Sequence, residues 1–348
     1  MMRMLRLSLP YLGRGFVGVF NARLFFAPVF LLLVLLVLLS VSSALLLFQG
    51  DFSVARALIG SASESSPKDI EVILRLIQDF RAPRILSCIV VGAGLGASGA
   101  CLQAITKNDI VGPGVIGISQ GTVFGIFCAL VFLNTSSPYM LSFFGILGGI
   151  FSGVLIILLV GKKFTSNRLL LVGMGVSLFA SACASILVTY SDLESAKEIL
   201  IWLTGALHGS SWKTLLSNAP IVAFGVVGIL AMSREIGLLS IDARIAAGLG
   251  INIKLIRLFA VLAIIVATSG SVAICGALSF VGLAAPHLSR FFFQSSFVHT
   301  VLGSMLFGSL IVLYADSLGK LAYAPVQIPA GAVTAIVGVP FLIFLLRK

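Results

Sequence analysis

Long apolar blocks alternate with short polar segments along this 348-residue chain. The first block, "FFAPVFLLLVLLVLLSVSSALLLF" (25–48), carries no charge and is long enough to cross a bilayer core as a helix. The blocks are continuous, whereas strands of a membrane barrel alternate apolar and polar residues. Backbone polar groups must also be satisfied within lipid, so the blocks are expected to be helices. The pattern predicts an all-α, polytopic membrane protein of about ten spans, at 25–48, 85–105, 114–133, 139–160, 169–190, 213–232, 257–275, 276–293, 300–317 and 331–346.

Composition agrees with a membrane protein. The chain is 59% hydrophobic and 10% charged, with a mean hydropathy of +1.16, whereas a soluble domain carries about 25% charge. The first block follows several arginines, which raises the possibility of a signal peptide. It is too long for a signal-peptide core, and no small-residue cleavage site follows it. An uncleaved first span is therefore expected.

The basic balance sets the orientation. A net charge of +11 in a soluble protein would suggest a nucleic-acid partner, but here the basic residues lie mainly in short loops between spans. With a cytoplasmic N-terminus, 15 of the 23 lysines and arginines fall on the cytoplasmic side and 8 outside, as the positive-inside rule requires. We expect both termini in the cytoplasm, membrane lipid as the surroundings, and no nucleic acid.

The candidate chemistry is sparse. The five cysteines lie inside apolar blocks without metal-type spacing, and the three histidines are scattered singly, so no metal site is predicted. "GLGASG" (94–99) matches a dinucleotide motif only formally, because it lies within a membrane helix. The sequence contains no GxxxxGK[ST] loop, so ATP-driven transport would need a separate ATPase. Acids are missing from the middle of the spans, which weakens proton coupling but leaves sodium coupling open.

Two polar stretches are noteworthy. In "DFRAPRILS" (79–87), Arg81 and Arg84 flank Pro83 at the start of the second apolar block. They could mark topology, anchor lipid headgroups or dock an acidic partner, and Pro83 marks where a helix can begin. On the cytoplasmic side, "SIDARIAAGLG" (240–250) has a Ser or Asp cap, an alanine-rich body and a terminal glycine. These signals predict a short helix that is a connector or a docking element.

Seven stretches in order resemble one family, the FecCD-type permease subunits of binding-protein-dependent ABC importers for iron–siderophore complexes, haem and cobalamin. They run from about residue 80 to the C-terminus: "FRAPRILSCIVVGAGLGASGACLQAITKN", "PGVIGISQGTVFG", "LLLVGMGVSLFASA", "WLTGALHGSSW", "GALSFVGLAAPHLSR", "YADSLGKLA" and "IPAGAVTAIVGVPFLIFLL".

The resemblance implies a type II ABC importer permease fold in the bacterial inner (plasma) membrane. It implies one transmembrane domain, 1–348, with a cytoplasmic N-terminal segment (1–24) and a cytoplasmic coupling segment (233–256). The expected partners are cytoplasmic ATPase subunits, a periplasmic or surface solute-binding protein, and a second permease subunit, identical or related. The chain itself would be no enzyme and would bind no cofactor, since ATP and Mg²⁺ belong to the partner ATPase.

The resemblance also implies site residues. Arg81, Arg84 and Lys320 match basic positions that meet acidic residues of the binding protein, a role that suits the bidentate guanidinium. The family's translocation path is lined by the fifth and tenth helices, so Ser177, Ser181 and Ser185 either line it or only pack helices. The coupling helix that meets the ATPase corresponds to Asp242, Ala243, Arg244, Ile245, Ala246, Ala247, Gly248, Leu249 and Gly250.

These inferences predict a permease that carries an iron complex, ferric siderophore first, with haem and cobalamin as alternatives within the family. The alternative from a different class is a stand-alone secondary transporter or channel. A structural membrane scaffold is a third possibility, but it would leave the paired arginines and the cytoplasmic segment without a role.

Overall fold

The structure is a computed structural model. It describes residues 34, 36–38, 41, 42, 71 and 74–346, apart from 134, 136, 162–164, 192, 208, 294, 295 and 323–325. The expected N-terminal segment (1–24) lies outside the described residues, and so does nearly all of the expected first span (25–48).

The described part of the chain is helical, as predicted. Six of its helices are long and apolar enough to cross a membrane: Leu74–Thr106, Pro138–Val160, Ser166–Tyr190, Trp212–Ala231, Ile253–Cys275 and Phe297–Leu321. In chain order the elements are η1 (Ile77–Arg81), α4 (Ala82–Thr106), α5 (Ile118–Leu133), α6 (Pro138–Val160), α7 (Ser166–Tyr190), α8 (Leu193–Thr204), α9 (Trp212–Ala231), α10 (Ser233–Ile241), α11 (Ala243–Gly248), α12 (Ile253–Cys275), α13 (Val281–Phe292), α14 (Phe297–Leu321) and α15 (Ala330–Leu346).

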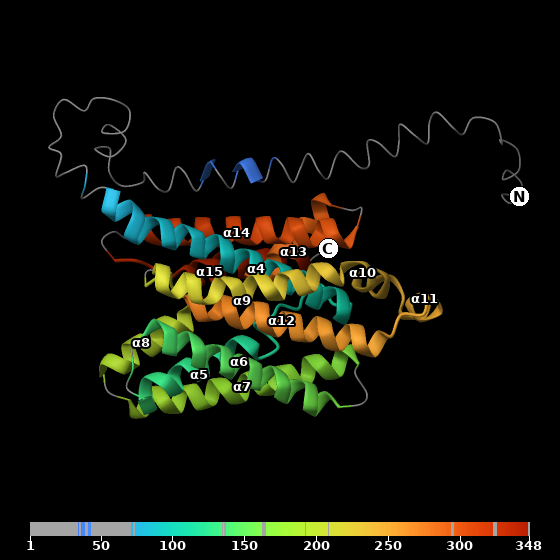
Figure 1. The fold of residues 1–348 in the computed structure, drawn as a ribbon, viewed down its shortest axis with the longest axis horizontal. Helices are drawn as coiled ribbons and strands as arrows, with labels where there is room; N and C mark the ends of the chain where they lie inside the picture. Colours follow the sequence, from blue (N-terminus) through green and yellow to red (C-terminus); the bar gives the residue numbers. More distant parts are fainter. Residues whose placement is uncertain are drawn as a thin grey trace, which may run out of the picture.

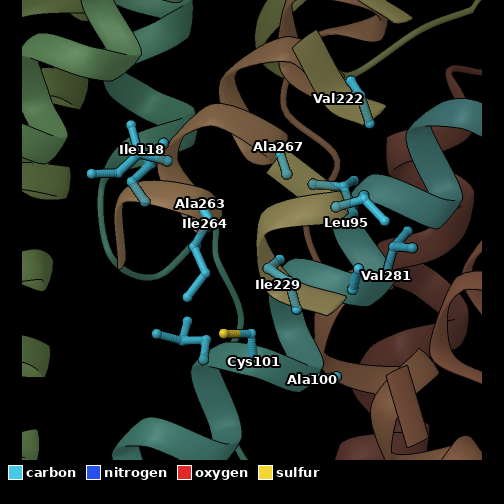
Figure 2. Close-up of a cluster of buried hydrophobic side chains, with 14 of the residues drawn as sticks. Leu95, Ala100, Cys101, Ile118, Val222, Ile229, Ala263, Ile264, Ala267 and Val281 are labelled. Atoms are coloured by element: carbon cyan, nitrogen blue, oxygen red, sulfur yellow. The ribbon is translucent and has the colours of Figure 1, made fainter. Parts of the chain in front are cut away.

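The long helices lie side by side in one bundle (Figure 1). The short helices α10 and α11 lie at one end, and α8 lies at the opposite end with the start of α4. α4 and α12 are the most buried spans, whereas much of α7 faces outward. Figure 2 shows the core that α4 and α12 share with α9, where Leu95, Ala267 and Val222 come together.

Small residues set the closest helix contact. A methyl group at Gly92 or Gly96 of α4 would collide with the backbone of α14 at Gly308 or Ser304. The two backbones therefore pack directly against each other, and the Ser309 hydroxyl donates across the contact to the Ile89 carbonyl at 2.8 Å. Small residues one turn apart allow such close packing in lipid, where no hydrophobic effect drives helices together.

Two expected spans are shorter than predicted. The block 114–133 becomes helical only at Ile118, because Gly117 turns the chain at φ 83°. The block 276–293 becomes helical only at Val281, because Gly276 and Phe280 both have φ near 78°. At 1.5 Å per residue, the 12 residues of α13 extend about 18 Å, well short of a bilayer core of about 30 Å. Neither block spans the membrane as one continuous helix.

Pro83 lies in the first turn of α4, near the predicted helix start, but it is not where helical structure begins. The helix runs from Leu74 to Thr106 without interruption. Before Pro83 it widens into a π-turn, η1, in which the Ala82 N–H donates to the Ile77 carbonyl. The wider turn accommodates a proline that has no N–H to donate and whose ring crowds the preceding turn.

Candidate functional site

The end of the bundle where α4 begins holds a buried ion pair that the sequence did not predict. Arg84 grips Asp316 of α14 with two hydrogen bonds, Nε–Oδ2 at 2.9 Å and Nη2–Oδ1 at 2.8 Å. The side chains are only 14% and 7% exposed, respectively. Lys320 Nζ lies 3.3 Å from Asp316 Oδ2, and the Gln327 carboxamide accepts from Arg84 at 3.1 Å. Arg84 and Lys320 therefore meet, as members of one site should, but on an acid of their own chain.

Arg81 occupies a different setting. It precedes Arg84 by one turn and lies at the end of η1, where its side chain is partly exposed. The three predicted docking residues thus divide into two that hold Asp316 and one at the rim. Asp316 was visible in the sequence as an acid near a span end, but its distance in sequence from Arg84 hid the pairing.

The segment expected to be the cytoplasmic coupling element (233–256) contains two short helices, α10 and α11, before α12 begins. α10 ends at Ile241, Asp242 adopts an extended conformation, and α11 follows. Asp242 caps α11, accepting from the Arg244 N–H at 2.7 Å, and Gly250 ends the turn at φ 81°. The cap and stop predicted from "SIDARIAAGLG" are where the sequence placed them.

An apolar stripe lies on this segment. Ile241, Ile245 and Leu249 are spaced four residues apart and are 73%, 54% and 64% exposed. Ala246, between them in sequence, is fully buried and holds α11 against the bundle. Only Ile245 lies on α11 itself, whereas Ile241 ends α10 and Leu249 directly follows α11. Exposed apolar side chains gathered at the end of a bundle are typical of a surface that a partner covers. We call these three residues the apolar stripe.

α10 connects the apolar stripe to the spans. Its Ile236 and Leu239 are buried, and Gly237 packs against Phe297 at the start of α14. Lys107 ends α4 in a left-handed conformation and donates from Nζ to the Ile241 carbonyl at 3.2 Å. The segment is therefore attached to the ends of both α4 and α14.

The α7 serines do not join either end. Ser177 and Ser181 are half-buried and Ser185 is exposed. The Ser185 hydroxyl donates to the Ser181 carbonyl one turn earlier, a bond that satisfies the hydroxyl within its own helix. Their arrangement is compatible with both helix packing and a path lining.

Sequence reasoning missed a buried amide near the end of α4. Gln103 of α4 is buried, and its Nε2 lies 3.1 Å from the Val111 carbonyl and 3.4 Å from that of Leu283. These carbonyls belong to the segment before α5 and to the first turn of α13. Arg290 donates to Gln103 Oε1 and pairs with Asp109 at 3.3 Å. The glycines at 112, 114 and 276 were the available signal that helix was absent there.

The comparisons with known proteins agree with this architecture. The FecCD transport family model matches residues 21–348. The Fe(3+)-citrate import system permease protein YfmD of Bacillus subtilis is 34% identical over 274 residues, 78% of this chain and 81% of that one. The iron-uptake system permease protein FeuC of the same organism is 30% identical over 321 residues, 89% of this chain and 95% of that one.

One solved structure extends the comparison to the fold. A chain of a transporter described as a metal-chelate type ABC transporter, in an inward-facing conformation, superposes with a TM-score of 0.78. It is 31% identical and covers 91% of this chain and 99% of its own length.

Together the fold and the comparisons define a multi-pass ABC transporter permease of type II architecture, a transport subunit and not a catalyst. The chain belongs to the FecCD transport family.

Proposed function

We propose that this chain forms half of the membrane path of an importer for an iron chelate, with a ferric siderophore or ferric carboxylate as cargo. The names of its relatives support the cargo, since YfmD is a ferric-citrate permease and FeuC an iron-uptake permease. The single observation that carries an ATPase-driven mechanism is the apolar stripe, which is exposed at one end of the bundle and anchored to α4 and α14.

The partners follow from this proposal. Residues 240–250 dock on a separate ATPase that binds ATP and Mg²⁺, within a cytoplasmic coupling segment at 233–256. A second permease subunit completes the path. Both termini and α10–α11 then face the cytoplasm, and Arg81 faces outside, where a solute-binding protein docks. Haem and cobalamin stay as alternative cargoes. Docking of the solute-binding protein and the nucleotide state of the ATPase must each favour one conformation of the permease through differential affinity. Without that difference the transporter could not alternate between its two conformations.

Uptake by the assembled transporter tests the cargo. We expect proteoliposomes that hold this chain, its ATPase and its binding protein to accumulate a ferric chelate only when ATP is enclosed with the ATPase. A panel of ferric citrate, ferric siderophores, haem and cobalamin identifies the class. Uptake of haem or cobalamin with no uptake of any ferric chelate would reject the iron proposal, and ATP-independent uptake would favour a secondary transporter.

The docking role can be tested at Arg81. Arg81→Glu should weaken binding of the solute-binding protein to the permease in nanodiscs about tenfold. The new carboxylate would repel the acidic residues of the binding protein and so lower the encounter rate. The remaining binding should also depend less on salt. Arg75→Glu, at an exposed position on the same helix, is the matched control and should change affinity less than threefold. Equal effects of the two variants would assign the binding to general surface charge and reject a specific role for Arg81.

A further inference from the structure

A cavity of about 340 Å³ lies where the chain breaks its helices inside the bundle. It is lined by the segments that precede α5 and α13, the first turn of α5, and Leu203 of α8. Gly282 packs against the Leu95 carbonyl near the middle of α4, and Gly117 packs against the Ser177 backbone near the middle of α7. The cavity is therefore close to the midplane of the spans. Non-helical backbone at that depth is tolerated where it is buried in protein or lines a wet cavity.

Two helices begin at this cavity. Ile118 opens the 16-residue α5 and Val281 opens the 12-residue α13, and Figure 2 shows both side chains held in the apolar core. The N–H groups of a first helical turn precede the first intrahelical bond, which in α5 runs from Gly121 to the Gly117 carbonyl. α13 contributes mainly its dipole, because the Val281 N–H bonds within its own turn, to the Ser279 carbonyl. Both helix ends favour negative charge.

A second observation is independent of the helix ends. Ser119 lines the cavity and is only 2% exposed. Within the part of the chain that the structure describes, its Oγ has no hydrogen-bond partner. A buried hydroxyl without a partner is costly. Of the six such hydroxyls among the described residues, at Ser87, Ser98, Ser119, Ser210, Thr268 and Ser269, only that of Ser119 lines this cavity. An unpartnered donor between two positive helix ends points to a ligand that brings acceptor oxygens.

The lining sets the chemistry of that ligand. All the cavity-lining side chains are uncharged, so neither a carboxylate nor a fixed cation competes for the helix ends. Its size is at the lower limit for small-molecule pockets, enough for a carboxylate-bearing arm or a small anion. The described residues also contain no group of three His, Cys, Asp or Glu side chains able to hold a metal ion. Recognition would therefore act on the oxygens of a chelator and not on its iron.

The surroundings connect this cavity with the proposed path. The Gly117 backbone packs against Ser177 of α7, and the Phe280 ring lies flat on Gly338 of α15. Phe280 also contacts Phe341 of α15 edge to face, with ring centroids 6.0 Å apart. The cavity therefore adjoins the two helices expected to line translocation.

We infer that this cavity is an anion subsite, which binds carboxylate oxygens of a negatively charged iron chelate through Ser119, Gln120 and the N-terminus of α5. The inference rests on the proposed function for the identity of the cargo. It narrows that cargo to carboxylate-type chelates in preference to uncharged ones.

Direct binding tests the subsite without transport. Trp202 precedes the cavity residue Leu203, and its carbonyl accepts from the Ala277 N–H at 3.1 Å. The chain has two tryptophans, so a Trp212→Phe background leaves Trp202 as the sole reporter. Titrating citrate onto this protein in nanodiscs of uncharged lipid, at constant ionic strength, should give a saturable fluorescence change. Mannitol, an uncharged polyol, should give none.

Variants assign that signal to the subsite. Gln120→Glu should raise the apparent Kd for citrate at least tenfold, because a carboxylate a few ångströms from the anion repels it. Ser119→Ala, which removes only the hydroxyl, should raise it about threefold. Gln78→Glu, the same change at an exposed position, is the matched control and should leave the Kd within twofold. If either cavity variant fails to fold, the other carries the test.

The outcomes separate the two proposals. Absence of a saturable citrate signal, or equal effects of Gln120→Glu and Gln78→Glu, overturns the subsite even where the wild-type transporter imports iron. Saturable citrate binding with no uptake of any ferric chelate overturns the proposed function and leaves the subsite standing. Where uptake occurs, Gln120→Glu should slow uptake of ferric citrate about tenfold and that of an uncharged ferric trihydroxamate less than threefold. Equal slowing of both would reject the anion assignment.

Discussion

Asp316→Asn should lower the free energy of unfolding by about 3–5 kcal/mol, because it leaves the buried Arg84 guanidinium without its counter-charge. Asp316 is almost fully buried and accepts from Arg84 through both carboxylate oxygens. Asn keeps the shape but offers a single acceptor oxygen, and it brings Lys320 into an uncompensated positive cluster. Denaturant titration of the purified protein in micelles, followed by circular dichroism, measures the loss.

A second ion pair provides the control. Arg75 and Glu71 form a bridge of 2.7 Å, but their side chains are 72% and 63% exposed. Water and salt screen such a pair, so Glu71→Gln should change stability by less than about 0.5 kcal/mol. Similar stability losses in Asp316→Asn and Glu71→Gln would show that burial gives the Arg84–Asp316 pair no special weight. The same reasoning shows that Arg84→Glu would be a poor docking test, since it places two carboxylates together inside the bundle.

Ile245→Asp should weaken ATPase association at least thirtyfold, or about 2 kcal/mol. Ile245 is the middle residue of the apolar stripe, and a partner that covers the stripe would have to bury the new carboxylate without a counter-charge. The fold should be unaffected, since more than half of Ile245 is exposed. Binding of the ATPase to the permease in nanodiscs, with unfolding measured in parallel, distinguishes docking from stability.

Ala247→Asp is the matched control for the stripe. It introduces the same charge two residues further along α11, about 200° around the helix from Ile245, at an exposed position. We expect its affinity for the ATPase to fall less than fivefold. If both variants bind the ATPase as tightly as the wild type, the apolar stripe is not the coupling surface. An equal loss of ATPase affinity in both variants would mean that the ATPase contacts α11 on all sides and not only on the face that carries Ile245.

The spans were the most predictable part of this chain, because continuous apolar blocks leave helix as the only solution in lipid. The bounds of α6, α7 and α9 fall within three residues of the blocks that predicted them. The cap of α11 was predictable as well, since Asp242 acts on the N–H of Arg244 two residues away. Local signals such as these need no knowledge of the tertiary structure.

Two of the misses depend on distant contacts, and one on a local break in a helix. The pairing of Arg84 with Asp316 joins residues 232 positions apart, and no periodicity in the sequence reports it. Hydropathy placed the start of α13 five residues too early, because 276–280 is apolar enough to span and only Gly276 hinted that it does not form helix. Gln103 looked like an isolated polar residue in a span, and its role appears only when Val111 and Leu283 are brought to it.

The glycine contact between α4 and α14 has a mechanical consequence. The two helices touch backbone to backbone at Gly92 and Gly96. Arg84 and Asp316 fasten the pair at one end, and α10 joins both helices at the other. Little side-chain volume remains between them that could slip or repack. A force applied to α10 would therefore displace the pair as a single rigid unit and would reach the opposite end of the bundle, where Arg81 lies. The rearrangement that opens or closes the path must then occur between the α4–α14 pair and its neighbouring helices, and not between α4 and α14 themselves.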